Sequence, residues 1–104
     1  MGMGRSNQIC FHSQQAAEKY LKVFLAFHEK HIRKIHDLDA LLMECHAIDS
    51  SFQEIFADGT YLTQFYLEAR YPSDIPEFSF EEGRKALVAA ERIRNFVLAR
   101  INPL

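Results

Sequence analysis

Apolar residues in the first third of the chain recur at steps of three and four. Between Asn7 and Lys30, no proline or glycine interrupts this pattern. Its apolar members are Ile9, Ala16, Ala17, Tyr20, Leu21, Phe24, Leu25 and Phe27. Such spacing places them on one face of an α-helix of about six turns. The pattern predicts an amphipathic helix over 7–30, with HEKHIRKI (28–35) forming a polar, basic turn at its end.

A second helix is predicted to begin after Asp37, whose short acidic side chain suits the N-cap position. Its apolar face consists of Leu38, Leu41, Leu42 and Cys45. A short helical piece is predicted to start at Ser50 and Ser51, and Asp58-Gly59 is expected to break it. The apolar residues of this piece are Phe52, Ile55 and Phe56.

A third helix is predicted from Thr60 to just before Pro72, because proline disfavours the helical conformation of the preceding residue. Its apolar side chains are Tyr61, Leu62, Phe65, Tyr66 and Ala69. The last helix is predicted to follow Ser79, which stands three residues before Glu82 as in a capping box. It runs to about Ile101, with a stripe of Ala86, Leu87, Ala90, Ile93, Val97 and Ile101. No long segment alternates with a period of two, so the predicted fold is an all-α, up-and-down bundle of four main helices.

Length and composition indicate one small domain spanning residues 1–104. The chain has 104 residues, of which 48% are apolar, and its nine phenylalanines can supply a core. Residues 1–8 (MGMGRSNQ), with their doubled Met-Gly, are expected to be flexible or foreign to the natural gene product.

The formal net charge is −2, so we do not expect a broad basic surface that binds nucleic acid. A local basic patch, Lys30, His31, Arg33 and Lys34, falls on the predicted turn, where such runs are usually solvated. No apolar run approaches the roughly 18 residues of a membrane span, and the start lacks a signal peptide. We therefore interpret Cys10 and Cys45 as reduced thiols of a cytoplasmic protein.

The histidines and glycines do not form a recognisable metal or phosphate motif. His28 and His31 are three residues apart, whereas a zinc-protease helix needs four. No three potential ligands converge at suitable spacing, and the glycines are terminal or isolated. We therefore expect no metal, no cofactor and no P-loop.

Four segments, taken in order, resemble the HEPN domain family. They are FHSQQAAEKYLK (11–22), HDLDALL (36–42), YLEARYP (66–72) and SFEEGRKALVAAERI (79–93). Each is weak alone, but the ordered set is specific and covers most of the chain. The resemblance implies a helical bundle, a homodimer and a minimal nucleotidyltransferase as partner in a toxin–antitoxin-like pair. It also implies nucleotide binding, which has been proposed for the family, and metal-independent ribonuclease activity, which many members have.

Two departures from the family pattern bear on this expectation. Ribonuclease members carry an arginine, four to six residues and then a histidine late in the bundle, but here no histidine follows His46. Such chemistry needs a histidine to move a proton and an arginine to stabilise phosphoryl charge. Arg5 and His12 have the spacing only at the N-terminus, which we interpret as coincidence. Most of the usual first helix is also absent, which predicts an uncovered apolar groove that a second copy covers.

Polar residues flanking the first predicted stripe, with four later ones, form the candidate binding surface. They are Gln14, Gln15, Glu18, Lys19, Lys22, His36, Asp37, Arg70 and Tyr71. The alternative is structural: a solvated helix face, with Asp37 as a cap and His36 packed at the turn. Arg70 either binds phosphate or pairs with Glu18 in the interior, and the second role is slightly favoured.

The leading hypothesis is a non-catalytic, dimeric interaction module that binds a nucleotidyltransferase, with a nucleotide at the shared interface as an open addition. One alternative is a metal-independent ribonuclease toxin that uses His12, His36 or Arg70. A third is a remnant domain with no present activity.

Overall fold

The computed structural model describes residues 4–31 and 36–101, which contain four α-helices and three short 3₁₀ turns. The α-helices are α1 (Arg5–Phe27), α2 (Leu38–Ile48), α3 (Phe56–Thr63) and α4 (Phe80–Ile101). The 3₁₀ turns are η1 (Ser50–Ile55), η2 (Leu67–Ala69) and η3 (Pro72–Asp74). These ranges contain no strand, so the predicted all-α bundle is confirmed. None of the described helices is long and apolar enough to cross a membrane.

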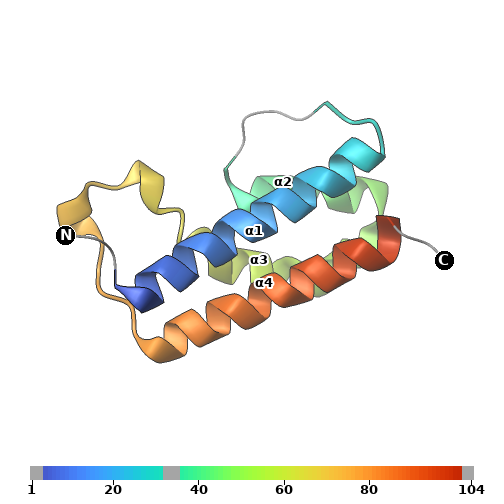
Figure 1. Cartoon of the computed structure of the whole chain (residues 1–104). Coiled ribbons are helices and arrows are strands. Elements are labelled where there is room, and N and C mark those ends of the chain that lie inside the picture. Colours follow the sequence, from blue (N-terminus) through green and yellow to red (C-terminus); the bar gives the residue numbers. More distant parts are fainter. Residues whose placement is uncertain (1–3, 32–35, 102–104) are drawn as a thin grey trace.

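The helix directions follow from the path of the connections. In Figure 1, α1 (blue to cyan) and α4 (orange to red) lie side by side and run the same way. Their starts meet where Gly83 packs against Ser6. The chain after α1 turns back along it, so that His36 lies beside Gln14 and α2 runs in the direction of α1. The up-and-down order therefore holds from α2 through α4, and the first connection is the exception.

The core is built mainly from phenylalanine and leucine side chains that several helices contribute. The largest fully buried apolar residues are Phe24, Phe52, Phe65, Leu21, Leu25, Leu38, Leu41, Leu42, Leu62, Ile93 and Val97. The ring of Phe52 lies between those of Phe24 and Phe96, at centroid distances of 4.5 and 4.9 Å. The first contact is tilted and the second is edge-on, which is a favourable geometry for aromatic pairs, and together they connect α1, η1 and α4.

Helix α1 is displaced by two to three residues from its predicted range of 7–30. It begins at Arg5, so residues 5–8 are helical and do not fit the expected flexible start; residues 1–3 lie outside the described ranges. It ends at Phe27 because Glu29 adopts a left-handed φ of 57° and the Lys30 N–H donates back to the Leu25 carbonyl at 2.9 Å. This is the hydrogen-bond pattern of a Schellman motif. Arg33 and Lys34 of the basic patch also fall outside the described residues.

The buried face of α1 is rotated relative to the predicted stripe. It consists of Asn7, Cys10, Ser13, Gln14, Ala17, Leu21, Phe24 and Leu25. Ile9 and Phe27, which the pattern placed in the core, are instead 37% and 53% exposed, and Leu87 of α4 is 47% exposed. The apolar residues of α1 thus occupy two faces: one packs in the core and the other remains accessible.

Asn7 fastens the start of α1 to the segment before α4. Its side-chain amide donates to the Pro76 carbonyl at 2.9 Å, and its carbonyl oxygen accepts from the Phe78 N–H at 2.8 Å. Both polar groups of this buried side chain are therefore satisfied, and both by backbone that is far away in sequence. The pair of bonds fixes where α4 can begin.

Two predicted helix caps are confirmed. The Asp37 carboxylate accepts from the Asp39 N–H at 2.9 Å at the start of α2. Ser79 and Glu82 form the reciprocal capping box of α4, each side chain accepting from the other's backbone N–H at 3.0 Å. Both caps satisfy helix N–H groups that lack intrahelical partners.

The third helix differs from its prediction because Gly59 does not break it. Helix α3 runs through Asp58-Gly59 and ends at Thr63, well before Pro72. Gly59 is buried against the Leu42 side chain, and a Cβ atom there would overlap the Leu42 Cδ1 methyl. The glycine therefore permits close packing of α3 on α2.

We predict that Gly59→Ala lowers the free energy of unfolding by about 1–3 kcal/mol, because Leu42 is buried and cannot easily move aside. Gly83→Ala is the matched control, since its new Cβ would lie at an ordinary 3.5 Å from Ser6 Cα. Alanine's higher helix propensity should make that variant equal to the wild type or up to about 1 kcal/mol more stable. Urea denaturation followed by circular dichroism measures both values. Equal effects of the two substitutions would contradict the packing role of Gly59.

Candidate functional site

The Glu18 carboxylate is the centre of a polar cluster on the side of α1 that faces the returning connection. Lys22 Nζ lies 3.0 Å from Glu18 Oε2, and His36 Nδ1 lies 3.1 and 3.2 Å from the two carboxylate oxygens. The Gln14 amide nitrogen lies 3.4 Å from Glu18 Oε1. We call Gln14, Glu18, Lys22 and His36 the Glu18 cluster.

Local sequence spacing and the path of the chain together produce this cluster. Gln14, Glu18 and Lys22 are each four residues apart, so they stack along one row of the helix surface. His36 immediately precedes the Asp37 cap, and the returning connection places His36 beside that row. The Glu18 side chain is only 13% exposed, so its interactions with Lys22 and His36 are weakly screened by water.

Gln14 is fully buried, which corrects its assignment to an exposed surface. Its amide nitrogen also lies 3.4 Å from the His36 backbone carbonyl, so it links α1 to the connection. Among the described residues, its side-chain carbonyl oxygen has no hydrogen-bond partner. A buried acceptor without a partner is costly, and the two donor contacts of the amide nitrogen offset this cost.

The His36 ring is held on two sides. It stacks on the Tyr66 ring at a centroid distance of 4.8 Å and an interplanar angle of 11°. Its Nδ1 faces Glu18, so a neutral ring that donates from Nδ1 leaves Nε2 as an acceptor directed away from the carboxylate. The side chain is 45% exposed, and an incoming group can therefore reach it.

Tyr66 and Glu68 belong to the same region, although the sequence did not identify them. The Gln15 side-chain amide donates to Glu68 Oε1 at 3.3 Å. Burial, followed by the nearby carboxylates of Glu68 and Glu18, raises the pKa of the Tyr66 hydroxyl. The sequence pattern placed Tyr66 on a continuous third helix. Because α3 ends at Thr63, its ring turns toward His36 instead, and no local signal marks this turn.

The remaining predicted residues lie around the cluster without joining it. Arg70 and Tyr71 are exposed on the loop between η2 and η3, and Tyr71 is 77% exposed. The expected pairing of Arg70 with Glu18 is wrong: Glu18 pairs with Lys22 and His36, and no contact joins Arg70 to it in the described structure. Asp37 acts as a helix cap. Lys19 is exposed on the side of α1 that faces away from the cluster, beside Tyr20 and Val23.

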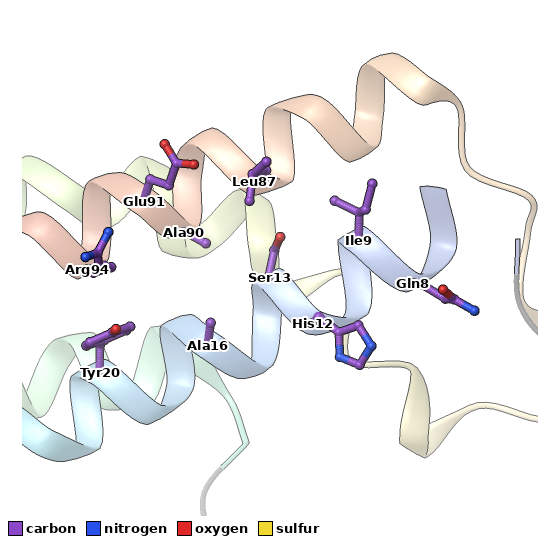
Figure 2. A pocket seen from close by; sticks show the side chains of 10 residues that line it. All are labelled: Gln8, Ile9, His12, Ser13, Ala16, Tyr20, Leu87, Ala90, Glu91 and Arg94. Carbon is purple, nitrogen blue, oxygen red and sulfur yellow. The ribbon is translucent and has the colours of Figure 1, made fainter. Parts of the chain in front are cut away.

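A second candidate site is a hollow between the two long parallel helices, the α1–α4 groove, which has a volume of about 480 Å³. Its lining residues are Gln8, Ile9, His12, Ser13, Ala16, Tyr20, Leu87, Ala90, Glu91 and Arg94. Figure 2 shows the Ala16 and Ala90 side chains pointing toward each other from the two helices. The small size of these side chains keeps the groove open.

The residues that the structure describes contain neither a cluster of metal ligands nor a reactive thiol. No three of their histidine, cysteine, aspartate and glutamate side chains are grouped so as to hold a metal ion. Cys10 and Cys45 are both free and buried. Burial, with a smaller contribution from a nearby glutamate, raises the pKa of Cys10 to about 11 and that of Cys45 to about 12. Both sulfurs therefore remain protonated and unreactive near neutral pH.

Comparison with protein-family models gives a match to the HEPN domain over residues 1–101. No curated protein and no solved structure matches the chain. The matched range includes both the Glu18 cluster and the α1–α4 groove.

We predict that Glu18→Gln lowers the free energy of unfolding by about 1–3 kcal/mol, because it leaves the largely buried Lys22 without its counter-ion. The matched control is Glu81→Gln, which removes a carboxylate from an exposed pair with Arg84. That variant should unfold like the wild type, since exposed pairs add little. Thermal unfolding at neutral pH measures both. A Glu18→Gln protein as stable as the control would show that the cluster is not a structural element.

Proposed function

Because the chain belongs to the HEPN domain family, we propose that it is a cytoplasmic, non-catalytic interaction module that acts as a homodimer and binds a minimal nucleotidyltransferase. The nature of the partner follows from the family. The polar residues of this chain support a particular docking surface for this partner.

The main support for this docking surface is the exposure of Arg70 and Tyr71. Tyr71 leaves 77% of its surface in solvent, and the Arg70 guanidinium has no ion-pair partner in the described structure. Neither side chain therefore contributes much to the core. Tyrosine and arginine are residue types that often dominate the binding energy of protein interfaces. Exposed on one loop, they are suited to insert into a partner.

The Glu18 cluster lies next to this loop. Arg70 follows Glu68 by two residues, so their Cα atoms are at most about 7.6 Å apart. Glu68 in turn accepts from Gln15 on α1. Lys22 offers an ammonium donor in the same region. A nucleotide phosphate at the shared interface would find donors in Lys22 and in Arg70.

The test uses the nucleotidyltransferase encoded beside this gene, titrated calorimetrically against the purified protein. Arg70→Ala and Tyr71→Ala should each weaken binding by tenfold or more and leave the unfolding temperature unchanged. Arg84→Ala, on the exposed side of α4, is the matched control and should bind like the wild type. Unchanged affinity in both loop variants would reject this docking surface. A gene neighbourhood without a nucleotidyltransferase would reject the named partner.

A second candidate function, a metal-independent ribonuclease, is favoured by the orientation of His36. The Glu18 carboxylate holds Nδ1, so Nε2 is free to accept the proton of a ribose 2′-hydroxyl. Arg70 is exposed and lies four residues after Tyr66, whose ring stacks on His36, so its guanidinium could stabilise charge on the phosphate. The lack of any histidine after His46 argues against a ribonuclease. The remaining hypothesis is a remnant domain without activity.

RNA incubated with the pure protein in EDTA separates these functions. For the interaction module we expect intact RNA, as judged by gel electrophoresis. A ribonuclease would release fragments ending in 2′,3′-cyclic phosphate. His36→Ala should then abolish cleavage, whereas His31→Ala, an exposed histidine outside the cluster, should leave it unchanged. Cleavage that survives His36→Ala would exclude the cluster as its source.

A further inference from the structure

The accessible face of α1 carries a stripe of residues that is symmetric about Ala16. The stripe consists of Ile9, His12, Ala16, Tyr20 and Val23. Ile9 and Val23 are 37% and 45% exposed, and the stripe lines the α1–α4 groove and its continuation along α1. His12 and Tyr20 stand four residues to either side of Ala16, and Ile9 and Val23 stand seven residues to either side.

Helix α4 carries a second symmetric stripe, and its centre lies at the same height. Its members are Leu87, Glu91, Arg94 and Leu98. Their order is apolar, charged, charged and apolar, which is the same from either end. Their midpoint falls between residues 92 and 93. Ser6 lies beside Gly83, and because the helices are parallel, ten residues further along each are Ala16 and Ile93. One axis can therefore pass both midpoints.

We propose that two copies of the chain pack face to face through these stripes, about a two-fold axis level with Ala16. Each helix would lie antiparallel to its own mate, α1 on α1 and α4 on α4. The idea rests on the proposed homodimer and specifies its surface and register. A two-fold interface must be self-complementary, and a stripe that is symmetric about its centre meets this condition along its whole length.

The residue pairs that this register creates on α1 are chemically matched. Ile9 faces the second copy's Val23, and His12 faces the second copy's Tyr20. At the centre, Ala16 meets Ala16, where the smallest side chains allow the two helix backbones to approach closely. The exposed apolar groups of Ile9 and Val23 leave water together, which is the main source of stabilisation.

The pairs on α4 provide the charge complementarity. Glu91 faces the second copy's Arg94, and the reverse contact repeats on the other side of the axis. Leu87, which is 47% exposed, faces the second copy's Leu98. The opposite charges meet only when the register is correct, so they select this alignment over a shifted one.

The area available is sufficient for a specific dimer. Two helices side by side present a face about 20 Å wide and about 30 Å long, or on the order of 600 Å² per copy. Stable interfaces bury roughly 600–1,000 Å² per partner. The open α1–α4 groove accepts side chains from the second copy.

Cysteine cross-linking tests the register. Ala16→Cys should form a disulfide-linked dimer on mild oxidation, because Cα atoms at the axis can come within the roughly 4.4–6.8 Å that a disulfide needs. Ile9→Cys alone and Val23→Cys alone should not, since equivalent atoms lie about 21 Å apart along the helix. A mixture of those two variants should cross-link. The wild type is the background control, because both native cysteines are buried.

Charge exchange on α4 is the second measurement. Arg94→Glu alone should weaken dimerisation by tenfold or more, because it places Glu91 opposite a glutamate. Combining it with Glu91→Arg should restore the wild-type dissociation constant, measured by sedimentation. Arg84→Glu, outside the stripe, should have no effect. A protein that stays monomeric would overturn the homodimer and this register together. A dimer with neither cross-links nor charge rescue would overturn the register alone.

Discussion

The polar side chains on the buried face of α1 determine where the rest of the chain can lie. Asn7 is satisfied only when the segment 76–78 runs past it, and Gln14 donates to the backbone of His36 from a fully buried position. An unmet polar group in the interior costs more than a typical surface contact contributes. Both long connections are therefore held against α1, and the starts of α2 and α4 follow from this.

Periodicity and capping chemistry predict most of the secondary structure here, because both are local. Asp37 and the Ser79–Glu82 pair mark helix starts through bonds that span two or three residues. Gly59 illustrates the limit. From the sequence alone, this glycine indicates a helix break. In the fold it permits close packing against Leu42, which belongs to another helix. The orientation of α1 was likewise mispredicted because two of its faces are apolar, and periodicity alone cannot rank them.

The candidate site also has a part that the sequence predicts and a part that it does not. The Glu18–Lys22 pair is predictable from the sequence because both residues lie on one helix, four positions apart. The approach of His36 and Tyr66 is not, since it requires the first connection to turn back and α3 to stop early. Arg70 was expected to reach the Glu18 carboxylate. His36 lies there instead, because backbone contact with Gln14 brings it close.

The parallel pairing of α1 with α4 has a consequence for biosynthesis. Of the four helices, α1, which is translated before the others, makes its most extensive contact with α4, which is translated after them. Until Phe80–Ile101 has been translated, the apolar side of the nascent first helix has no permanent cover. At roughly 5–20 residues per second this delay lasts several seconds, long enough for chaperones to matter. Folding of this bundle is thus completed only after α4 has been translated.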